Sequence, residues 1–478
     1  MLRFIKKGEE KMKKLGFGIA ALLLASTVTI AAETKMESTP VAVTSITMDQ
    51  LDEMVTKRVE DILAKNEENK IEEEKTEEKK TEDGSWNVFG YGRTTLRASK
   101  NNDWNTTSYE GHTDNFMGRL GGESETNYLE IGGSRKWVKE NGSWAKVSTR
   151  VEYGNNYSYI DSSSPESDDD STQFELKELF VELGGLESLP DDYTLWAGRR
   201  YYKRMAGAFS DDFFVQSSGV GIGIENPRWS AALVGVDADG TTDNSAPDNL
   251  GKSANTVYNL DMRYHAVDNW DFQVNLYGDN EDNKPADKDS NFGFATRATY
   301  NLPGYYFAGK GFSNASLIYG KGLAGGAAGV NFGDWVPTDI SDDAQMVRFN
   351  TLGVWDINEK WSMGTEINIL LGNEDNPWAP DGLKAGIIAR PQYVVNDNFK
   401  IIFEGSYGKR DFDVDWGGYE SYDLVSGTIA PTFTVDSGFW GRPEIRTFIS
   451  CIKDVSGGEK ANGEDTEILI GTQAEFWF

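Results

Sequence analysis

EILIGTQAEFWF, residues 467–478, is the stretch of this chain that decides its fold. Successive side chains of a β-strand point to opposite faces, so the stretch sorts into two sets. The mostly apolar set consists of Ile468, Ile470, Thr472, Ala474, Phe476 and Phe478. The other set consists of Leu469, Gly471, Gln473, Glu475 and Trp477. The pattern predicts a last strand with one apolar face and one largely polar face.

The same alternation recurs through residues 86–478. Clear cases are TVYNLDMRYH (256–265), WDFQVNLY (270–277) and GTEINILLG (364–372), in which aromatic or aliphatic residues alternate with polar ones. A soluble β-sandwich would show the same period with its apolar face inward. The length of the pattern and the aromatic strand ends instead favour an all-β, antiparallel transmembrane barrel, apolar outside and polar inside. A last strand ending in Phe478 is also similar to the assembly signal of outer-membrane barrels, which implies the barrel assembly machinery as a partner.

The N-terminus predicts export from the cytoplasm. From Met12 the chain reads MKKLGFGIAALLLASTVTIAAET, in which two lysines precede an apolar run and small residues follow at Ala31 and Ala32. This order is that of a secretory signal peptide. We therefore expect residues 1–32 to be a signal peptide with Met12 as its true start. No later window is apolar enough for a helical membrane span.

Residues 33–85 have a different composition from the strands that follow. We expect a linker over 33–46, and a short periplasmic helix with a charged spacer over 47–85. Met48, Leu51, Val55 and Ile62 have the spacing of a coiled-coil seam, although Arg58 interrupts it. Because an isolated short helix is marginal in water, association of copies would supply the missing burial.

The composition excludes several classes of function. The chain has 478 residues, a formal net charge of −30, one cysteine (Cys451) and two histidines (His112 and His265). Phosphate binding needs a basic face, so a nucleic-acid partner is excluded. One cysteine cannot form an intrachain disulfide, and so few Cys and His residues leave little material for a zinc site or His-based catalysis. We expect no enzyme activity, no cofactor and no metal.

Six short segments resemble the maltoporins, the family of sugar-specific porins of Gram-negative outer membranes. They are FGYGR (89–93), RLGGESETNYLEIGG (119–133), WAGRRYYKR (196–204), GVGIGIEN (219–226), FWGRPEIR (439–446) and AEFWF (474–478). The resemblance covers nearly all of residues 86–478. It implies an eighteen-stranded outer-membrane barrel, a homotrimer with one pore in each subunit, and a loop within residues 193–226 that folds into the barrel.

The resemblance also implies an aromatic slide along the pore. An aromatic plane stacks on the apolar C–H face of a pyranose without fixing one position, and binding must stay weak and repeated for the sugar to leave. The slide maps onto Tyr91, Tyr128, Phe312, Trp440 and Trp477.

Strand parity supports three of these positions independently of the resemblance. Tyr91 shares a face with Arg93, and Trp477 shares one with Glu475. Trp440 lies in step with the charged residues that follow it in FWGRPEIR.

Tyr128 depends on the alignment, because an ungapped match would place Asn127 in the slide. We prefer Tyr128, since Glu130 then shares its face while the apolar Leu129 and Ile131 face lipid. For every slide residue the alternative is membership of the aromatic girdle at the membrane interface.

A polar track of ionised side chains would hydrogen-bond the sugar hydroxyls as they pass. It maps onto Arg93, Arg119, Glu130, Lys177, Arg204 and Asp211. Lys177 stands where the family often has arginine, and an ammonium grips neighbouring hydroxyls less specifically than a planar guanidinium. The alternative is the generic charge that every water-filled porin carries in its lumen.

Three departures from the family pattern concern the identity of the sugar. Met205 and Ala206 follow Arg204, where maltoporins carry polar residues, which makes the narrow loop less polar. Phe213 stands at the constriction in place of tyrosine, which keeps a stacking surface and removes a hydroxyl. The loop 155–171 lacks the tryptophan that the family places there, with Tyr157 or Tyr159 as its stand-in.

We therefore expect a passive outer-membrane channel for sugars, either maltodextrin-like oligosaccharides or related carbohydrates. The alternative is a general diffusion porin for ions and small solutes in the same scaffold, and a surface adhesin with a plugged lumen is less favoured. An outer-membrane enzyme would need an acid/base constellation that neither histidine provides. The expected partners are two further copies of the chain, the oligosaccharide and outer-membrane lipid.

Overall fold

The computed structural model describes residues 84–105, 115–120, 127–155, 174–210, 212–237, 256–266, 269–279, 290–326, 329–333, 340–373, 382–412, 421–457 and 464–478. All of them belong to Lys80–Phe478, one of two compact units into which the chain divides. The predicted signal peptide, linker and periplasmic helix lie outside the described residues, as do His112, Tyr157, Tyr159 and Asp211. Within the described ranges, no helix is long and apolar enough to cross a membrane.

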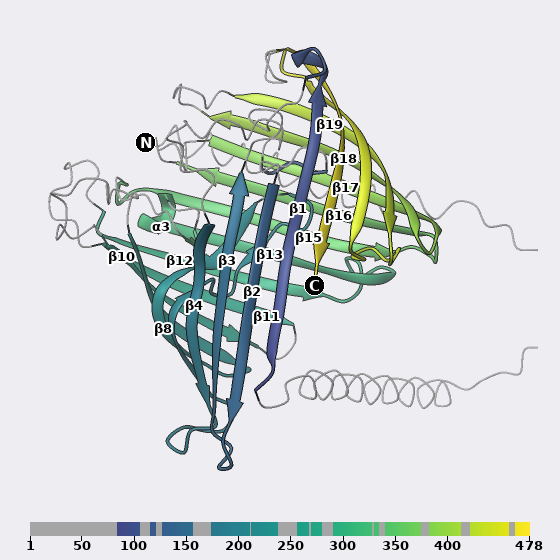
Figure 1. Ribbon diagram of the computed structural model, residues 1–478. Helices are drawn as coiled ribbons and strands as arrows, with labels where there is room; N and C mark the ends of the chain where they lie inside the picture. Colours follow the sequence, from purple (N-terminus) through teal and green to yellow (C-terminus); the bar gives the residue numbers. More distant parts are fainter. Residues whose placement is uncertain are drawn as a thin grey trace, which may run out of the picture. The chain divides into compact units, whose positions relative to one another are not determined.

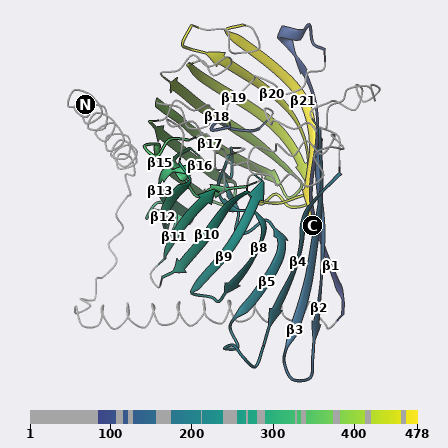
Figure 2. The ribbon, with the colours of Figure 1, turned by 90° about the vertical axis from the view of Figure 1, so that its left-hand side faces the viewer.

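An 18-stranded antiparallel sheet closes on itself as a barrel (Figure 1). Each strand pairs with the next barrel strand along the chain. β1 (Trp86–Ser99) also pairs with β21 (Thr466–Trp477), which closes the ring, and Figure 2 shows it between β21 and β2 (Asn127–Val138). The other barrel strands are β3 (Trp144–Asn155), β4 (Phe174–Gly184), β5 (Thr194–Arg200), β8 (Gly219–Glu225), β9 (Trp229–Asp237), β10 (Thr256–His265), β11 (Trp270–Asp279), β12 (Phe292–Leu302), β13 (Lys310–Gly322), β15 (Gln345–Asp356), β16 (Trp361–Gly372), β17 (Gly382–Asn396), β18 (Phe399–Phe412), β19 (Tyr422–Thr434) and β20 (Glu444–Asp454). The predicted eighteen-stranded barrel is confirmed.

Side-chain alternation gives the wall its two faces. In β11 the side chains of Gln273 and Asn275 are buried on the inner face, while Trp270 and Phe272 are exposed on the outer face. In β16 Glu366 is likewise buried inside. An outer apolar band that faces lipid and an inner polar face are the two surfaces a membrane barrel needs.

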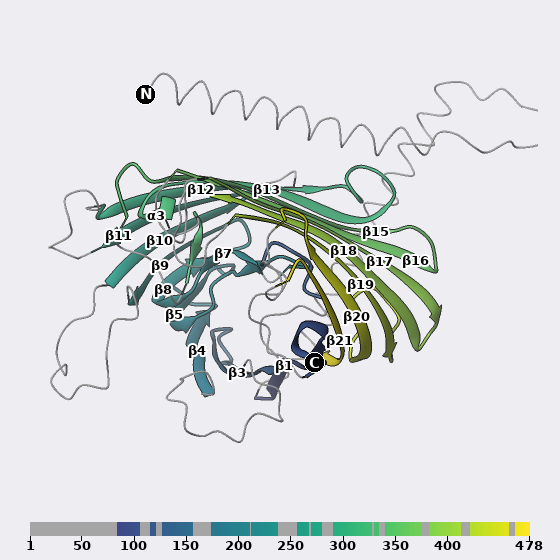
Figure 3. The same cartoon turned by 90° about the horizontal axis from the view of Figure 1, so that it is seen from above.

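Several connections fold into the barrel instead of leaving it. The loop 201–218 contains β6 (Met205–Ala206) and β7 (Phe213–Ser217), and β7 lies inside the ring of strands in Figure 3. The connection after β13 contributes α3 (Leu323–Gly326) and β14 (Asn331–Phe332), which pairs with β7 in a small three-stranded sheet. The short 3-10 helix η1 (Lys100–Asn102) follows β1.

An apolar core fixes the inserted loop against one part of the inner wall. Phe214, Val215 and Phe332 of the inserted segments are buried with inner-face residues such as Val234 and Ile318. This part of the lumen is packed with side chains. The positions predicted to bind sugar come mainly from other strands of the wall.

Candidate functional site

The inserted loop 201–218 is held by polar contacts to four strands. Asp212 forms an ion pair with Arg348 of β15, and Ser217 donates a hydrogen bond to Asp261 of β10. The backbone N–H of Phe209 donates to Glu366 of β16 at 2.7 Å, and Lys203 donates to Ser230 of β9 at 2.9 Å. Buried charges and polar groups need such partners, so the loop is fixed in the lumen at several points.

Phe213 and Arg204 meet in this loop, as part of a stack that includes a residue absent from the predicted set. The guanidinium carbon of Arg204 lies 3.9 Å from the centre of the Tyr201 ring and 4.3 Å from that of Phe213. Phe213 is 40% exposed. The run of two tyrosines in WAGRRYYKR was the available signal for Tyr201. The inserted loop thus presents a cation between two aromatic planes.

Tyr128 lies on the inner face of β2, as the preferred alignment predicts. Its hydroxyl is 2.5 Å from a carboxylate oxygen of Glu130 and 2.9 Å from one of Glu152, and it can donate its one proton to either. Arg150 joins the group through an ion pair with Glu130 at 2.8 Å. Asn127 bonds instead to Thr94, an outward-facing residue of β1.

A β-bulge in β4 brings Lys177 to the group that surrounds the hydroxyl of Tyr128. Arg150 of β3 pairs with Glu178, whereas the next residue of β3 pairs with Leu176, so Lys177 is the extra residue on β4. Its ammonium lies 3.6 Å from Glu152 and 2.6 Å from Glu175. A bulge turns a side chain away from its expected face, and simple alternation would not have placed Lys177 here.

Tyr91 connects this group to a second polar cluster at the other end of the predicted slide. Its ring centre lies 5.9 Å from that of Tyr128, and its hydroxyl donates to Glu475 at 2.9 Å. Glu475 also lies 3.6 Å from Arg119 and 2.8 Å from Arg442.

Trp477 lies on the same inner face of β21 as Glu475, as predicted, and is 40% exposed. The guanidinium carbon of Arg442 lies 4.5 Å from its ring centre. Glu475 pairs with Arg446 as well, and the neighbouring Glu444 pairs with Arg442 at 2.9 Å. Trp477 therefore borders a dense cluster of paired charges.

The parity argument for Trp440 is wrong, because residues 435–443 are a turn and β20 begins only at Glu444. The turn folds inward, with Lys400 donating to the carbonyl of Gly438 at 2.9 Å. Trp440 stacks on Phe209 of the inserted loop, with ring centres 6.1 Å apart and planes 10° apart. Trp440 lies in the lumen because this turn folds inward, and the alternation of a strand could not have predicted that.

Phe312 and Arg93 occupy two further positions on the inner wall. Phe312 is on the inner face of β13 and 43% exposed, and no ring contact joins it to the other predicted slide residues within the described chain. Arg93 is 7% exposed, and its guanidinium carbon lies 5.9 Å from the Tyr128 ring centre.

Burial shifts the pKa of two loop residues near the site. It raises the pKa of Tyr202 to about 12. It lowers the pKa of the Lys203 ammonium, while the carboxylate of Glu225, 3.2 Å away, opposes that change.

These contacts form one continuous path inside the barrel. It begins at Phe213 and Arg204 and continues to Tyr201, whose hydroxyl donates to Glu152 at 3.0 Å. Glu152 also contacts Tyr128, which packs against Tyr91. From Tyr91 the path reaches Glu475 and the charges beside Trp477. Aromatic planes and ionised groups alternate along it. In the described part of the chain, no group of three or more His, Cys, Asp or Glu side chains is arranged to hold a metal ion.

Comparison with known proteins identifies relatives of this barrel. The family model described as LamB porin matches residues 87–478. The maltoporin of Vibrio cholerae serotype O1 (strain El Tor Inaba N16961) is 26% identical over 76% of this chain and 88% of its own. Maltoporin 1 of Aeromonas salmonicida is 28% identical over 81% of this chain and 93% of its own. Among solved structures, the outer membrane protein OprD from Pseudomonas aeruginosa is 8% identical over 83% of this chain and 94% of its own, with a TM-score of 0.42.

Proposed function

The chain belongs to the LamB porin family, and from this premise we propose that sugars cross its barrel along the aromatic path that ends at Trp477. The protein is a sugar-specific channel of the Gram-negative outer membrane. The family match favours this function over the general porin and the adhesin, and the family consists of channels. The proposal concerns the route, the residues and the kind of sugar.

The exposed aromatic surfaces on the inner wall carry the proposal. Trp477, Trp440, Phe213 and Phe312 are each about 40% exposed, so part of each ring is open to a solute in the lumen. Pairs of aromatic rings gain roughly 0.5–1.5 kcal/mol each beyond the burial of their area, and the stacking of a sugar's C–H face on such a ring is a contact of the same order. Contacts of this size hold a sugar without trapping it.

The charged groups beside the path supply the polar half of the mechanism. Arg119, Glu130, Lys177 and Arg204 all lie within contact distance of a path residue or its ion-pair partner. Because these charges are already paired, a sugar hydroxyl exchanges one hydrogen bond for another as it passes. Asp211, outside the described residues, is part of the same proposal on the resemblance alone.

The named relatives support maltodextrins as the transported sugars. We propose in addition that three copies assemble, that the outer wall faces lipid, and that Phe478 engages the barrel assembly machinery during insertion.

Liposome swelling tests the selectivity. The protein is reconstituted, and swelling rates are compared for maltotriose and raffinose, two trisaccharides of similar size. The aromatic path predicts faster swelling with maltotriose, whose linear glucose chain presents successive pyranose faces. Equal rates for the two sugars would contradict the selective path and indicate a sieve that sorts solutes by size.

A further inference from the structure

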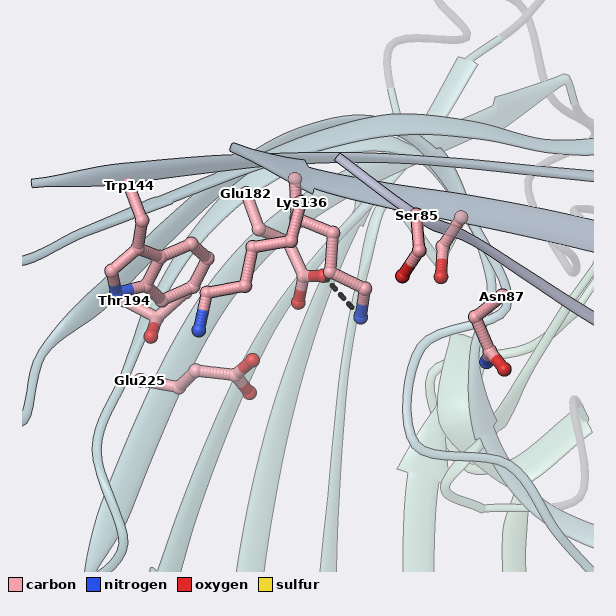
Figure 4. A pocket seen from close by; sticks show the side chains of 9 residues that line it. Ser85, Asn87, Lys136, Trp144, Glu182, Thr194 and Glu225 are labelled. Atoms are coloured by element: carbon pink, nitrogen blue, oxygen red, sulfur yellow. Dashed lines mark ion pairs between the residues drawn. The ribbon is translucent and has the colours of Figure 1, made fainter. Parts of the chain in front are cut away.

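A cavity of about 270 Å³ opens at the end of the barrel that carries the short turns, which is the periplasmic end of a barrel of this kind. We call it the mouth pocket. Inner-face residues of β1, β2, β3, β4, β5 and β8 line it. In Figure 4 the side chains of Asn87, Lys136, Trp144, Glu182 and Glu225 surround one common space. None of them belongs to the predicted slide or track.

Each of the two carboxylates that line the mouth pocket is paired with two basic groups. Lys146 pairs with Glu182 at 3.0 Å, and Arg200 lies 3.4 Å from Glu182 and 3.5 Å from Glu225. Lys203 pairs with Glu225 at 3.2 Å. Of these three basic groups only Lys146 lines the pocket, and both carboxylates are engaged before the remaining lysine of the lining is considered.

That remaining lysine, Lys136, has no carboxylate within ion-pair distance among the described residues. Its ammonium lies 4.6 Å from the centre of the Trp144 ring, an aromatic contact that leaves its positive charge without an anionic partner. The lining holds two lysines and two glutamates, and because both glutamates are already paired with other basic groups, Lys136 is the basic group left for an external anion.

The rest of the lining suits a small polyhydroxylated ligand. Asn87, Ser134 and Thr194 offer amide and hydroxyl groups that both donate and accept hydrogen bonds, and the indole of Trp144 offers an apolar surface and an N–H. The volume lies just below the range of about 300–1,000 Å³ typical of sites for drug-sized molecules. A single sugar ring is a ligand of suitable size.

We propose that the mouth pocket binds a sugar that carries a carboxylate or phosphate group, with Lys136 as the principal partner of the anion. The inference rests on the proposed function in one respect, because the sugar reaches the pocket through the lumen. It differs from that function in its residues, in its place on the wall and in the charge of the ligand.

Current block in planar bilayers tests the proposal on the full chain at low salt. The probes are glucuronate, glucose 6-phosphate, glucose and inorganic phosphate, added to the side of the short turns. We expect the two acidic sugars to bind at least about tenfold more tightly than glucose. Lys136→Gln should weaken them about tenfold, the effect of losing one charge-assisted hydrogen bond. The matched control is Lys139→Gln, which removes the same charge from the exposed turn beside the pocket and should change little.

The outcomes separate the inference from the proposed function. The tighter binder of the two acidic sugars identifies the anion as carboxylate or phosphate. The inference fails if glucose or inorganic phosphate binds as tightly as the acidic sugars, or if Lys136→Gln has no more effect than Lys139→Gln. Maltohexaose block in the same bilayers reports the aromatic path: retained block with no acidic-sugar effect overturns the inference alone, and loss of both overturns the proposed function as well.

Discussion

Glu475 is the residue on which the polar side of the proposed path depends. It is buried, accepts a hydrogen bond from Tyr91 and pairs with Arg119, Arg442 and Arg446. Removing one partner from a buried ionic group leaves the opposite charges uncompensated. This destabilises a protein more than replacing the whole group with apolar residues does.

Glu475→Gln is therefore expected to lower the free energy of unfolding by about 3–5 kcal/mol, because Glu475 pairs with all three guanidinium groups and Glu444 pairs with only two of them. The measurement is unfolding in detergent, followed by the loss of β-sheet circular dichroism. Glu359→Gln, in the exposed turn between β15 and β16, is the matched control. A variant at Glu475 no less stable than this control would contradict the role given to the cluster.

Several residue positions could be predicted because they depend only on alternation. Tyr91, Tyr128 and Trp477 share faces with charged neighbours, and those faces are the inner ones. Lys177 and Trp440 could not be placed by alternation, because Lys177 lies in a β-bulge and Trp440 lies in a turn. Tyr201 was missed because a loop residue has no alternation to follow.

At the level of elements, polar anchors hold the inserted loop 201–218 in the lumen. Asp212 is the anchor at its tip, in an ion pair with Arg348 that is almost wholly buried. The barrel strands are held by continuous ladders of hydrogen bonds, so loss of this pair should release the loop and leave the barrel closed.

Asp212→Asn is expected to raise single-channel conductance and its noise, because the released loop no longer holds one position in the lumen. Limited proteolysis should then cut within residues 201–218. Asp192→Asn, in the exposed turn before β5, is the control and should behave as the unmodified protein. Unchanged conductance and resistance to protease in Asp212→Asn would show that the apolar core alone fixes the loop.

The strands could be predicted from the sequence, but the inward course of two other segments could not. Segment 115–120 lies against the inner wall, where a side chain at Gly386 would collide with the backbone of Phe116. The turn 435–443 folds inward through the bond from Lys400 to Gly438. Both positions depend on contacts with residues far away in the chain, and the local periodicity of a sequence does not predict such contacts.

At the level of the whole molecule, the barrel is closed within a single chain, so assembly is a separate step. We expect purified full-length protein in mild detergent to have the mass of three copies by light scattering. Deleting residues 47–83 tests the source of assembly: a retained trimer places the contacts on the barrel, and a monomer places them on the N-terminal seam. A monomeric full-length protein would contradict the trimer.

The central claim is that sugars bind to aromatic rings on the inner wall, and single-channel current block by maltohexaose tests it most directly. The account predicts concentration-dependent block that becomes about three- to tenfold weaker in Trp477→Ala, the loss of one stacking contact. In Trp137→Ala, which removes an exposed outer-face tryptophan of β2, maltohexaose should block the current as strongly as in the unmodified protein. Equal weakening in both variants, or no block by maltohexaose in the unmodified channel, would contradict the account.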